Sequence, residues 1–164
     1  MGEFDCQIEP HPDGSYCVVC PEIPAAPAVP EQTIIDPRLG WNASAHSVEA
    51  LSGDCYTQFT IPAGVVGVVC GFAPTHVDSR PVNVPFGLYA YSSAGRSYWR
   101  VFERGVAKTA PVVRAPETDL FRIERRGQKV RYFFNNHQYY VSADNYAGAL
   151  RVVACMYRAG DGVN

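Results

Sequence analysis

Apolar residues along this chain occur in short runs, and few of them recur with a helical period. Residues 65–72 form a continuous run of Val, Gly, Cys and Phe, a pattern typical of a strand buried on both faces. Shorter, loosely alternating runs surround it, and no stretch of i, i+3, i+4, i+7 spacing is long enough to predict a helix. Strands are predicted at residues 55–61, 65–72, 84–91, 97–103, 106–113, 119–126, 129–134, 138–142 and 149–157.

Turn residues connect these runs at short intervals. Gly127-Gln128 predicts a hairpin between 119–126 and 129–134, and Asn135-Asn136 predicts a tight turn, because Asn tolerates the positive φ of a type I′ turn. Roughly ten short strands at this spacing predict an antiparallel β-sandwich. Four residues of the first hairpin are predicted to face its core: Phe121, Ile123, Val130 and Tyr132.

Charge divides the chain into two parts. Residues 1–37 contain seven acids and no Lys or Arg, whereas residues 38–164 contain nine acids and fourteen bases, a balance of +5. Seven of the 13 prolines also lie in the first part, and those at residues 21–30 predict an extended polyproline-like segment. We therefore expect two units: an acidic Pro- and Cys-rich arm (1–37) and a β-sandwich (38–164). A disordered leader, or an arm folded back on the basic body, are alternatives that composition leaves open.

Overall composition excludes several classes. The charged fraction of 18% beside 47% hydrophobic residues argues against wholesale disorder, and a net charge of −2 argues against a nucleic-acid binder. The longest apolar stretch, residues 63–74, is too short to span a bilayer, and no secretory signal follows Met1. We expect no membrane insertion.

The six cysteines fall into two groups. Cys55, Cys70 and Cys155 lie within apolar runs and are predicted to be small buried thiols. The other three lie in the arm, where Cys17 and Cys20 have the C-x2-C spacing of a metal site. A turn at residues 11–14 would fold Cys6 back toward them, with His11 as a fourth ligand. Zinc, an iron–sulfur cluster, a disulfide and free thiols all remain open for this group.

Three segments resemble the opening of concanavalin A-like (laminin G-like) lectin modules: 40–45 (GWNASA), 51–54 (LSGD) and 68–72 (VVCGF). The resemblance continues in residues 119–125 (DLFRIER), 130–132, 135–136 and 139–142. It covers about residues 37–164. Modules of this type with a Pro-rich, Cys-containing leader are similar to those of bacteriophage tail-fibre and tail-tip proteins. The resemblance implies a jelly-roll sandwich with a concave face and recognition loops at its rim; it does not imply sugar binding, because the fold also serves as a spacer or a protein-binding module.

Candidate contact residues follow from this reading. The polar loop 75–80 belongs at a sandwich rim, where loops carry recognition. Tyr139 and Tyr140 are predicted to point to opposite faces, which leaves one of them exposed, and Trp41 is predicted to plug the core at the domain entrance. The candidate ligand-binding residues are Thr75, His76, Asp78, Arg80, Tyr98 and Tyr139.

The same fold includes glycoside hydrolases, whose retaining members carry a Glu-x-Asp-x-Glu or Glu-x-Asp-x-x-Glu string. Here Glu117 and Asp119 begin such a string, but Phe121 and Arg122 stand where its second Glu belongs, and the next acid is Glu124. This departure removes the acid/base catalyst, so the sequence predicts no enzymatic activity.

The leading hypothesis is that the protein is a non-enzymatic attachment component of a phage tail, located in the virion. A homotrimer is the expected oligomer, because fibres are commonly built from three chains. The arm would dock to other tail proteins, and the sandwich would be displayed toward a host-surface glycan or protein, or for subunit packing. A free carbohydrate-binding lectin module is the alternative, and a glycosidase is the least favoured.

Overall fold

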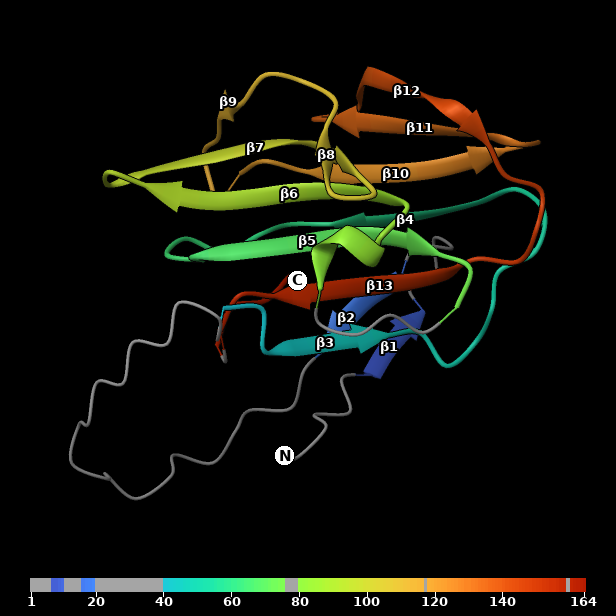
Figure 1. The fold of residues 1–164 in the computed structure, drawn as a ribbon, viewed down its shortest axis with the longest axis horizontal. Coiled ribbons are helices and arrows are strands. Elements are labelled where there is room, and N and C mark those ends of the chain that lie inside the picture. Colours follow the sequence, from blue (N-terminus) through green and yellow to red (C-terminus); the bar gives the residue numbers. More distant parts are fainter. Residues whose placement is uncertain (1–6, 11–15, 20–39, 76–79, 117, 159) are drawn as a thin grey trace.

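The computed structural model describes residues 7–10, 16–19, 40–75, 80–116, 118–158 and 160–164 (Figure 1). Every strand pairing in it is antiparallel. Helical structure in these ranges consists of one 3-10 turn, η1 (Pro81–Asn83). The strands are β1 (Gln7–Pro10), β2 (Tyr16–Val19), β3 (Ala43–His46), β4 (Cys55–Phe59), β5 (Gly67–Ala73), β6 (Phe86–Ser93), β7 (Arg96–Glu103), β8 (Val106–Ala107), β9 (Val112–Val113), β10 (Phe121–Arg126), β11 (Lys129–Phe134), β12 (His137–Asn145) and β13 (Arg151–Met156).

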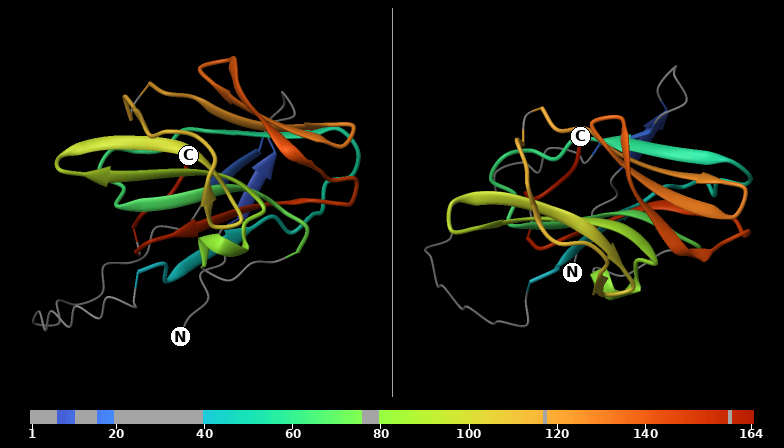
Figure 2. Two further views of the ribbon diagram at one scale, coloured as in Figure 1. Left: turned by 45° about the horizontal axis from the view of Figure 1, so that its top comes forward. Right: turned by 90° about the horizontal axis from the view of Figure 1, so that it is seen from above.

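Two sheets pack face to face and enclose the main core (Figure 2). The larger sheet has the order β3-β13-β5-β6-β7-β8, with β9 also paired to β7, and the smaller sheet has the order β12-β11-β10-β4. Side chains from the facing surfaces of both sheets fill the space between them, among them Phe72, Leu88, Trp99 and Ile123. The predicted all-β, antiparallel jelly-roll sandwich is confirmed.

Strand β5 lies at the centre of the larger sheet, and all seven of its residues are buried. Val68 and Phe72 face the main core, whereas Val69 and Ala73 belong to a second apolar cluster on the outer side of the same sheet. A Cβ at Gly71 would lie 1.9 Å from the carbonyl oxygen of Phe86, so this close approach to β6 requires glycine. The prediction of a strand buried on both faces is therefore correct.

The β10–β11 hairpin and the turn that follows it also match their predictions. Phe121, Ile123, Val130 and Tyr132 are each fully buried. Asn135 and Asn136 have φ of 49° and 66°, the two positive values that a type I′ turn requires. Asn135 also fixes the start of β10, because its Oδ1 accepts a hydrogen bond of 2.8 Å from the Leu120 N–H.

One predicted strand is divided in the structure. Residues 106–113 form two short strands, β8 and β9, which pair with different parts of the long strand β7. Pro111 lacks an N–H for a ladder, and Thr109 leaves the strand so that its Oγ1 accepts a hydrogen bond from the Val101 N–H at 3.1 Å. Strand β3 was not among the predicted strands, because four residues of Ala, Ser and His carry little hydrophobic pattern.

Part of the arm is described. Strands β1 and β2 form a two-stranded sheet of their own, in which Gln7 pairs with Val19 and Pro10 with Tyr16. Residues 11–14, where a turn is expected, lie outside the described residues, so that turn remains a prediction. This hairpin lies beside β3 and β4 (Figure 1). The proline-rich segment 21–30 lies outside the described residues, so the polyproline-like extension and the 37/38 boundary remain predictions.

The three cysteines of the sandwich are thiols as predicted, and two of the three are buried. Cys70 and Cys155 are buried, Cys55 is partly buried, and all three carry thiols rather than disulfides. Burial strongly raises the pKa of the Cys70 thiol, which keeps it protonated and unreactive. Across the described part of the chain, no helix has the length and apolar character needed to cross a membrane.

Candidate recognition surface

Aromatic side chains gather on the outer face of the larger sheet. Strand alternation directs Leu88 and Trp99 into the main core, so the residues beside them in β6 and β7 point outward. The cross-strand register pairs Tyr91 with Tyr98 and Tyr89 with Arg100. The outward row therefore consists of two aromatic residues on β6 and two aromatic residues and one arginine on β7: Tyr89, Tyr91, Tyr98, Arg100 and Phe102.

The rings of this row stack on one another. The ring centroids of Tyr89 and Tyr91 are 4.8 Å apart, and those of Tyr91 and Tyr98 are 5.6 Å apart. The Arg100 guanidinium lies over both Tyr89 and Tyr91, at 5.5 and 5.3 Å from their ring centroids. These contacts fix the rings in place before any ligand arrives, which lowers the entropy cost of binding.

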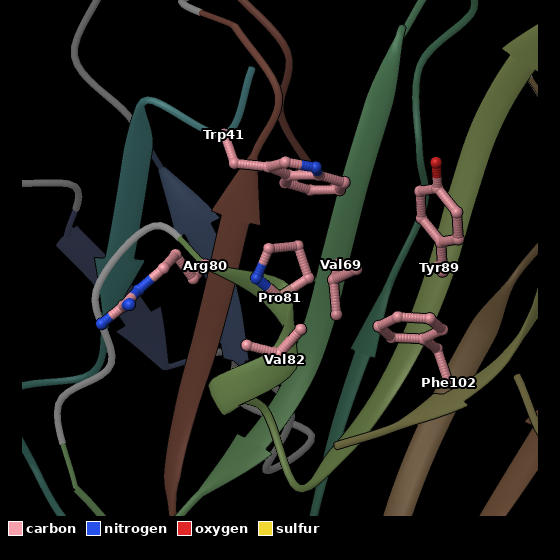
Figure 3. A pocket seen from close by; sticks show the side chains of 7 residues that line it. All are labelled: Trp41, Val69, Arg80, Pro81, Val82, Tyr89 and Phe102. Carbon is pink, nitrogen blue, oxygen red and sulfur yellow. The ribbon is translucent and has the colours of Figure 1, made fainter. Parts of the chain in front are cut away.

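Beside this row lies an apolar hollow of about 380 Å³. Figure 3 shows Trp41 and Tyr89 on either side of Val69, with Pro81 and Val82 of η1 nearby and the Arg80 side chain extending away from the rings. Seven residues line the hollow: Trp41, Val69, Arg80, Pro81, Val82, Tyr89 and Phe102.

Trp41 owes its position to small neighbours and a backbone bond. Its backbone N–H donates a hydrogen bond of 2.7 Å to the Tyr157 carbonyl, and its ring meets the Tyr157 ring edge-on, with the ring centroids 5.8 Å apart. A Cβ at Gly67 would lie 3.2 Å from the Tyr157 Cβ and 3.5 Å from the Trp41 ring, so Gly67 lies directly against both aromatic residues. Trp41 packs on the second apolar cluster but is only partly buried, so it does not fully plug the core as predicted; its remaining surface lines the hollow.

The electrostatics of this surface are mild. Burial raises the pKa of Tyr89, and the Arg100 guanidinium partly offsets this effect. The tyrosine therefore stays a neutral hydroxyl at physiological pH. The arrangement offers flat ring faces, a hydroxyl and a fixed cation, which suits a ligand with apolar faces and polar edges. None of the described residues that line the hollow is a carboxylate.

The predicted rim loop is divided between two hollows. Arg80 lines the aromatic hollow. Thr75 lines a second, more polar hollow of about 480 Å³ on another part of the larger sheet, together with His46, Val48, Pro74 and Arg151. His76 and Asp78 lie outside the described residues, so their predicted role stays untested.

The two predicted tyrosines lie on different sheets. Tyr98 belongs to the outward row, whereas Tyr139 lies on β12, where its ring is 4.7 Å from that of Trp99. Tyr139 is 42% exposed and Tyr140 is partly buried against the main core, in agreement with the prediction that one of the two is exposed. A register shift between β11 and β12 lies beside Tyr132, whose ring centroid is 5.8 Å from that of Tyr140.

Sequence reasoning missed Tyr89, Tyr91, Arg100 and Phe102. Their period-2 spacing was visible, but alternation alone does not tell which face of a strand meets the core. That choice depends on the neighbours of β6 and β7 in the sheet.

The carboxylates of the hydrolase hypothesis have structural contacts. Asp119 accepts hydrogen bonds from the Ala115 N–H at 2.6 Å and from Asn135 Nδ2 at 3.0 Å, which fixes the turn before β10. Glu124 lies on the outer side of the smaller sheet, in ion pairs with arginines. Neither residue lines either hollow, and Glu117 lies outside the described residues.

The predicted metal site is not tested by the structure. Cys6, His11 and Cys20 lie outside the described residues, and of Cys17 the structure describes the backbone in β2, opposite Glu9. Within the ranges that are described, no group of three or more His, Cys, Asp or Glu side chains is arranged to hold a metal ion.

Comparison with known proteins concerns the fold. No family model matches the sequence, and neither does any curated protein. The carbohydrate recognition domain of Emp47p is similar in structure, with a TM-score of 0.46 and 9% identity over 74% of this chain and 72% of that one. A Bacillus licheniformis β-glucanase has a TM-score of 0.39 and 9% identity over 70% of this chain and 58% of that one.

A β-1,3-1,4-glucanase (lichenase) from a mouse hindgut metagenome gives the same TM-score of 0.39 and 9% identity, over 72% of this chain and 61% of that one. All three structures have the concanavalin A-like jelly-roll fold that the sequence resemblance implied. With TM-scores below 0.5, these likenesses carry no argument about a ligand, a reaction or a partner.

Proposed function

We propose that this protein is a non-enzymatic attachment module that binds a carbohydrate at the aromatic surface of its larger sheet. The observation that carries the proposal is the fixed row of stacked tyrosines beside the Trp41 hollow. A sugar ring has an apolar face and hydroxyl edges. The apolar hollow beside Trp41 can receive the first, and the Arg100 guanidinium next to Tyr89 can pair with the second.

We further propose that the module is part of a phage tail. In this setting residues 1–37 dock to other tail proteins and the sandwich is presented to a host-surface glycan. The support for this setting is the sequence resemblance and the contrast between an acidic arm and a basic body. Display of several copies, for example as a homotrimer, would raise the avidity of a weak single site.

The binding test uses the full chain and two variants of the outward row. Binding is first sought on a glycan array, and the dissociation constant of the best ligand is then measured by calorimetry. Tyr91→Ala removes a ring stacked on both sides, and Arg100→Gln removes the cation above it. Each is expected to weaken binding by about tenfold, the equivalent of roughly 1.4 kcal/mol.

Tyr139→Ala is the matched control, because it removes an exposed ring from the other sheet. It is expected to leave the dissociation constant unchanged. Thermal unfolding of every variant separates loss of a contact from loss of the fold. A silent array, or equal losses in Tyr91→Ala and Tyr139→Ala, would contradict the proposed site.

The role of the arm has its own test. Residues 1–37 are deleted in the phage genome, and purified particles are examined for the sandwich by immunoblot. We expect the truncated chain to be absent from particles although it is produced. Normal incorporation would refute docking through the arm and favour a free lectin module, whose binding would not depend on assembly.

A further inference from the structure

A strongly basic surface covers the outer face of the smaller sheet. Alternation along β10 directs Phe121, Ile123 and Arg125 toward the core and leaves Arg122, Glu124 and Arg126 on the outer side. The register with β11 places Arg131 opposite Glu124 and Lys129 opposite Arg126. We call this set of four cations around one carboxylate the arginine face: Arg122, Arg126, Lys129, Arg131 and Glu124.

Glu124 organises this surface. Its Oε2 pairs with Arg122, and its Oε1 lies 3.3 Å from Arg126 Nε and 3.6 Å from Arg131 Nη1. The Glu124 side chain is 6% exposed, whereas the Arg126 side chain is 63% exposed and that of Arg131 is 33% exposed. The carboxylate therefore lies beneath the guanidiniums and holds them, while parts of two of them face solvent.

The arginine face carries a net charge of +3. One internal carboxylate cannot balance four cations, and a guanidinium has five N–H donors in a planar fork that matches a carboxylate. Side chains two residues apart on a strand are separated by about 7 Å, and adjacent strands by about 4.8 Å. The cations thus form a repeating pattern along β10 and β11. Neither of the two hollows described above is lined by residues of this face.

These features select among anionic partners. A single-stranded nucleic acid needs free ring faces for its bases, but Arg122 already lies over Tyr56 and Phe133, at 4.8 and 5.0 Å from their centroids. An acidic peptide that adds as a strand needs a sheet edge, whereas this surface is the face of a sheet. A flexible polymer with an acid group on successive units can lie flat across the cations.

We infer that the arginine face binds an acidic polysaccharide, one whose sugar units carry carboxylate groups. The carboxylates pair with the solvent-facing donors of Arg126 and Arg131, and Lys129 adds a third positive charge opposite Arg126. This site lies on the smaller sheet, so it does not depend on the aromatic surface of the larger one.

The test measures binding of the full chain to immobilised polygalacturonate, with neutral dextran, poly-L-glutamate and a single-stranded oligonucleotide as comparisons. The double variant Arg126→Gln/Arg131→Gln is expected to bind polygalacturonate at least about tenfold more weakly, the loss expected of one or two charge-assisted hydrogen bonds. Raising the salt to roughly 0.5 M should weaken binding by the original chain, because the contacts are exposed.

The control is Arg96→Gln/Lys108→Gln, which removes the same charge from the larger sheet, at the start of β7 and just after β8. It is expected to bind like the original chain, and thermal unfolding confirms that both doubles fold. Three results would overturn the inference: no binding to polygalacturonate at low salt, equal losses in the two doubles, or equally tight binding of poly-L-glutamate or the oligonucleotide. Loss of the aromatic site through Tyr91→Ala should leave polygalacturonate binding intact, which distinguishes the two surfaces.

Discussion

Replacement of Arg125 by Met tests how the loops at one end of the sandwich are held. Arg125 is 1% exposed and points into the protein from β10. Its Nε donates a hydrogen bond of 2.8 Å to the Gly53 carbonyl, its Nη1 donates to the Gly148 carbonyl, and its Nη2 reaches the Leu51 carbonyl at 3.4 Å. One guanidinium therefore ties the loop before β4 to the loop before β13.

The expected cost follows from the acceptors that lose their donor. The carbonyls of Gly53 and Gly148 lose a charged donor, and a hydrogen bond to a charged group contributes about 1.5–3 kcal/mol. Both glycines are exposed, so water replaces part of each lost bond. Met has a similar volume and removes the desolvation cost of the buried charge, which offsets part of this loss. We expect Arg125→Met to lower the free energy of unfolding by about 2–4 kcal/mol, which corresponds to a fall in Tm of roughly 4–16 °C.

The assay is guanidinium chloride unfolding followed by tryptophan fluorescence. Arg126→Met is the matched control, because this neighbouring side chain is 63% exposed and its removal should cost less than about 1 kcal/mol. Arg125→Lys should fall between the two, since it keeps the charge but has fewer fixed donors. An unchanged midpoint for Arg125→Met, or an equal loss in Arg126→Met, would refute this explanation.

Two further predictions concern the sheets. Burial, and then the neighbouring Glu103, raises the pKa of Tyr132 well above its usual 10, so the unfolded chain releases this proton first. The contribution of Tyr132 to the free energy of unfolding should thus be constant below about pH 10 and fall above it. Tyr132→Phe loses the 2.8 Å hydrogen bond to Glu103 and should be less stable at neutral pH, but its free energy of unfolding, measured in urea titrations, should fall less steeply at alkaline pH. Gly71→Ala should lower the free energy of unfolding by more than about 3 kcal/mol or prevent folding, because its Cβ would meet the Phe86 carbonyl. Gly162→Ala is the control: a Cβ there has no atom within 4 Å, so this variant should unfold like the original chain in the same experiment.

Local pattern was sufficient for most of the sandwich. The continuous apolar run at residues 65–72 predicts a strand buried on both faces, and the Asn135-Asn136 turn follows from the φ values that Asn tolerates. Both depend on neighbours in sequence. For residues 106–113, Pro111 is a local signal against one continuous strand, but the pairing of β8 and β9 with different parts of β7 depends on the sheet.

The candidate surface was less accessible to sequence reasoning. Tyr98 and Arg80 were identified, but Tyr89 and Arg100 become neighbours only when β6 and β7 pair, and Trp41 reaches them across the sheet. The register shift between β11 and β12 is likewise an irregularity that no periodicity in the sequence reveals. Recognition surfaces of this kind arise from strand order, and strand order is a long-range property of the fold.

The chain has two tryptophans, and each reports on a different surface: Trp41 on the aromatic surface of the larger sheet and Trp99 on the region around Tyr139. Trp41 lines the aromatic hollow, and Trp99 is buried beneath Tyr139. The most direct measurement is a titration of the ¹⁵N-labelled full chain with the best glycan from the array, in which the two indole N–H signals are followed by NMR. Our account predicts that the Trp41 signal shifts with ligand concentration while the Trp99 signal stays in place; a shift of Trp99 alone, or of neither signal on saturation, would contradict it.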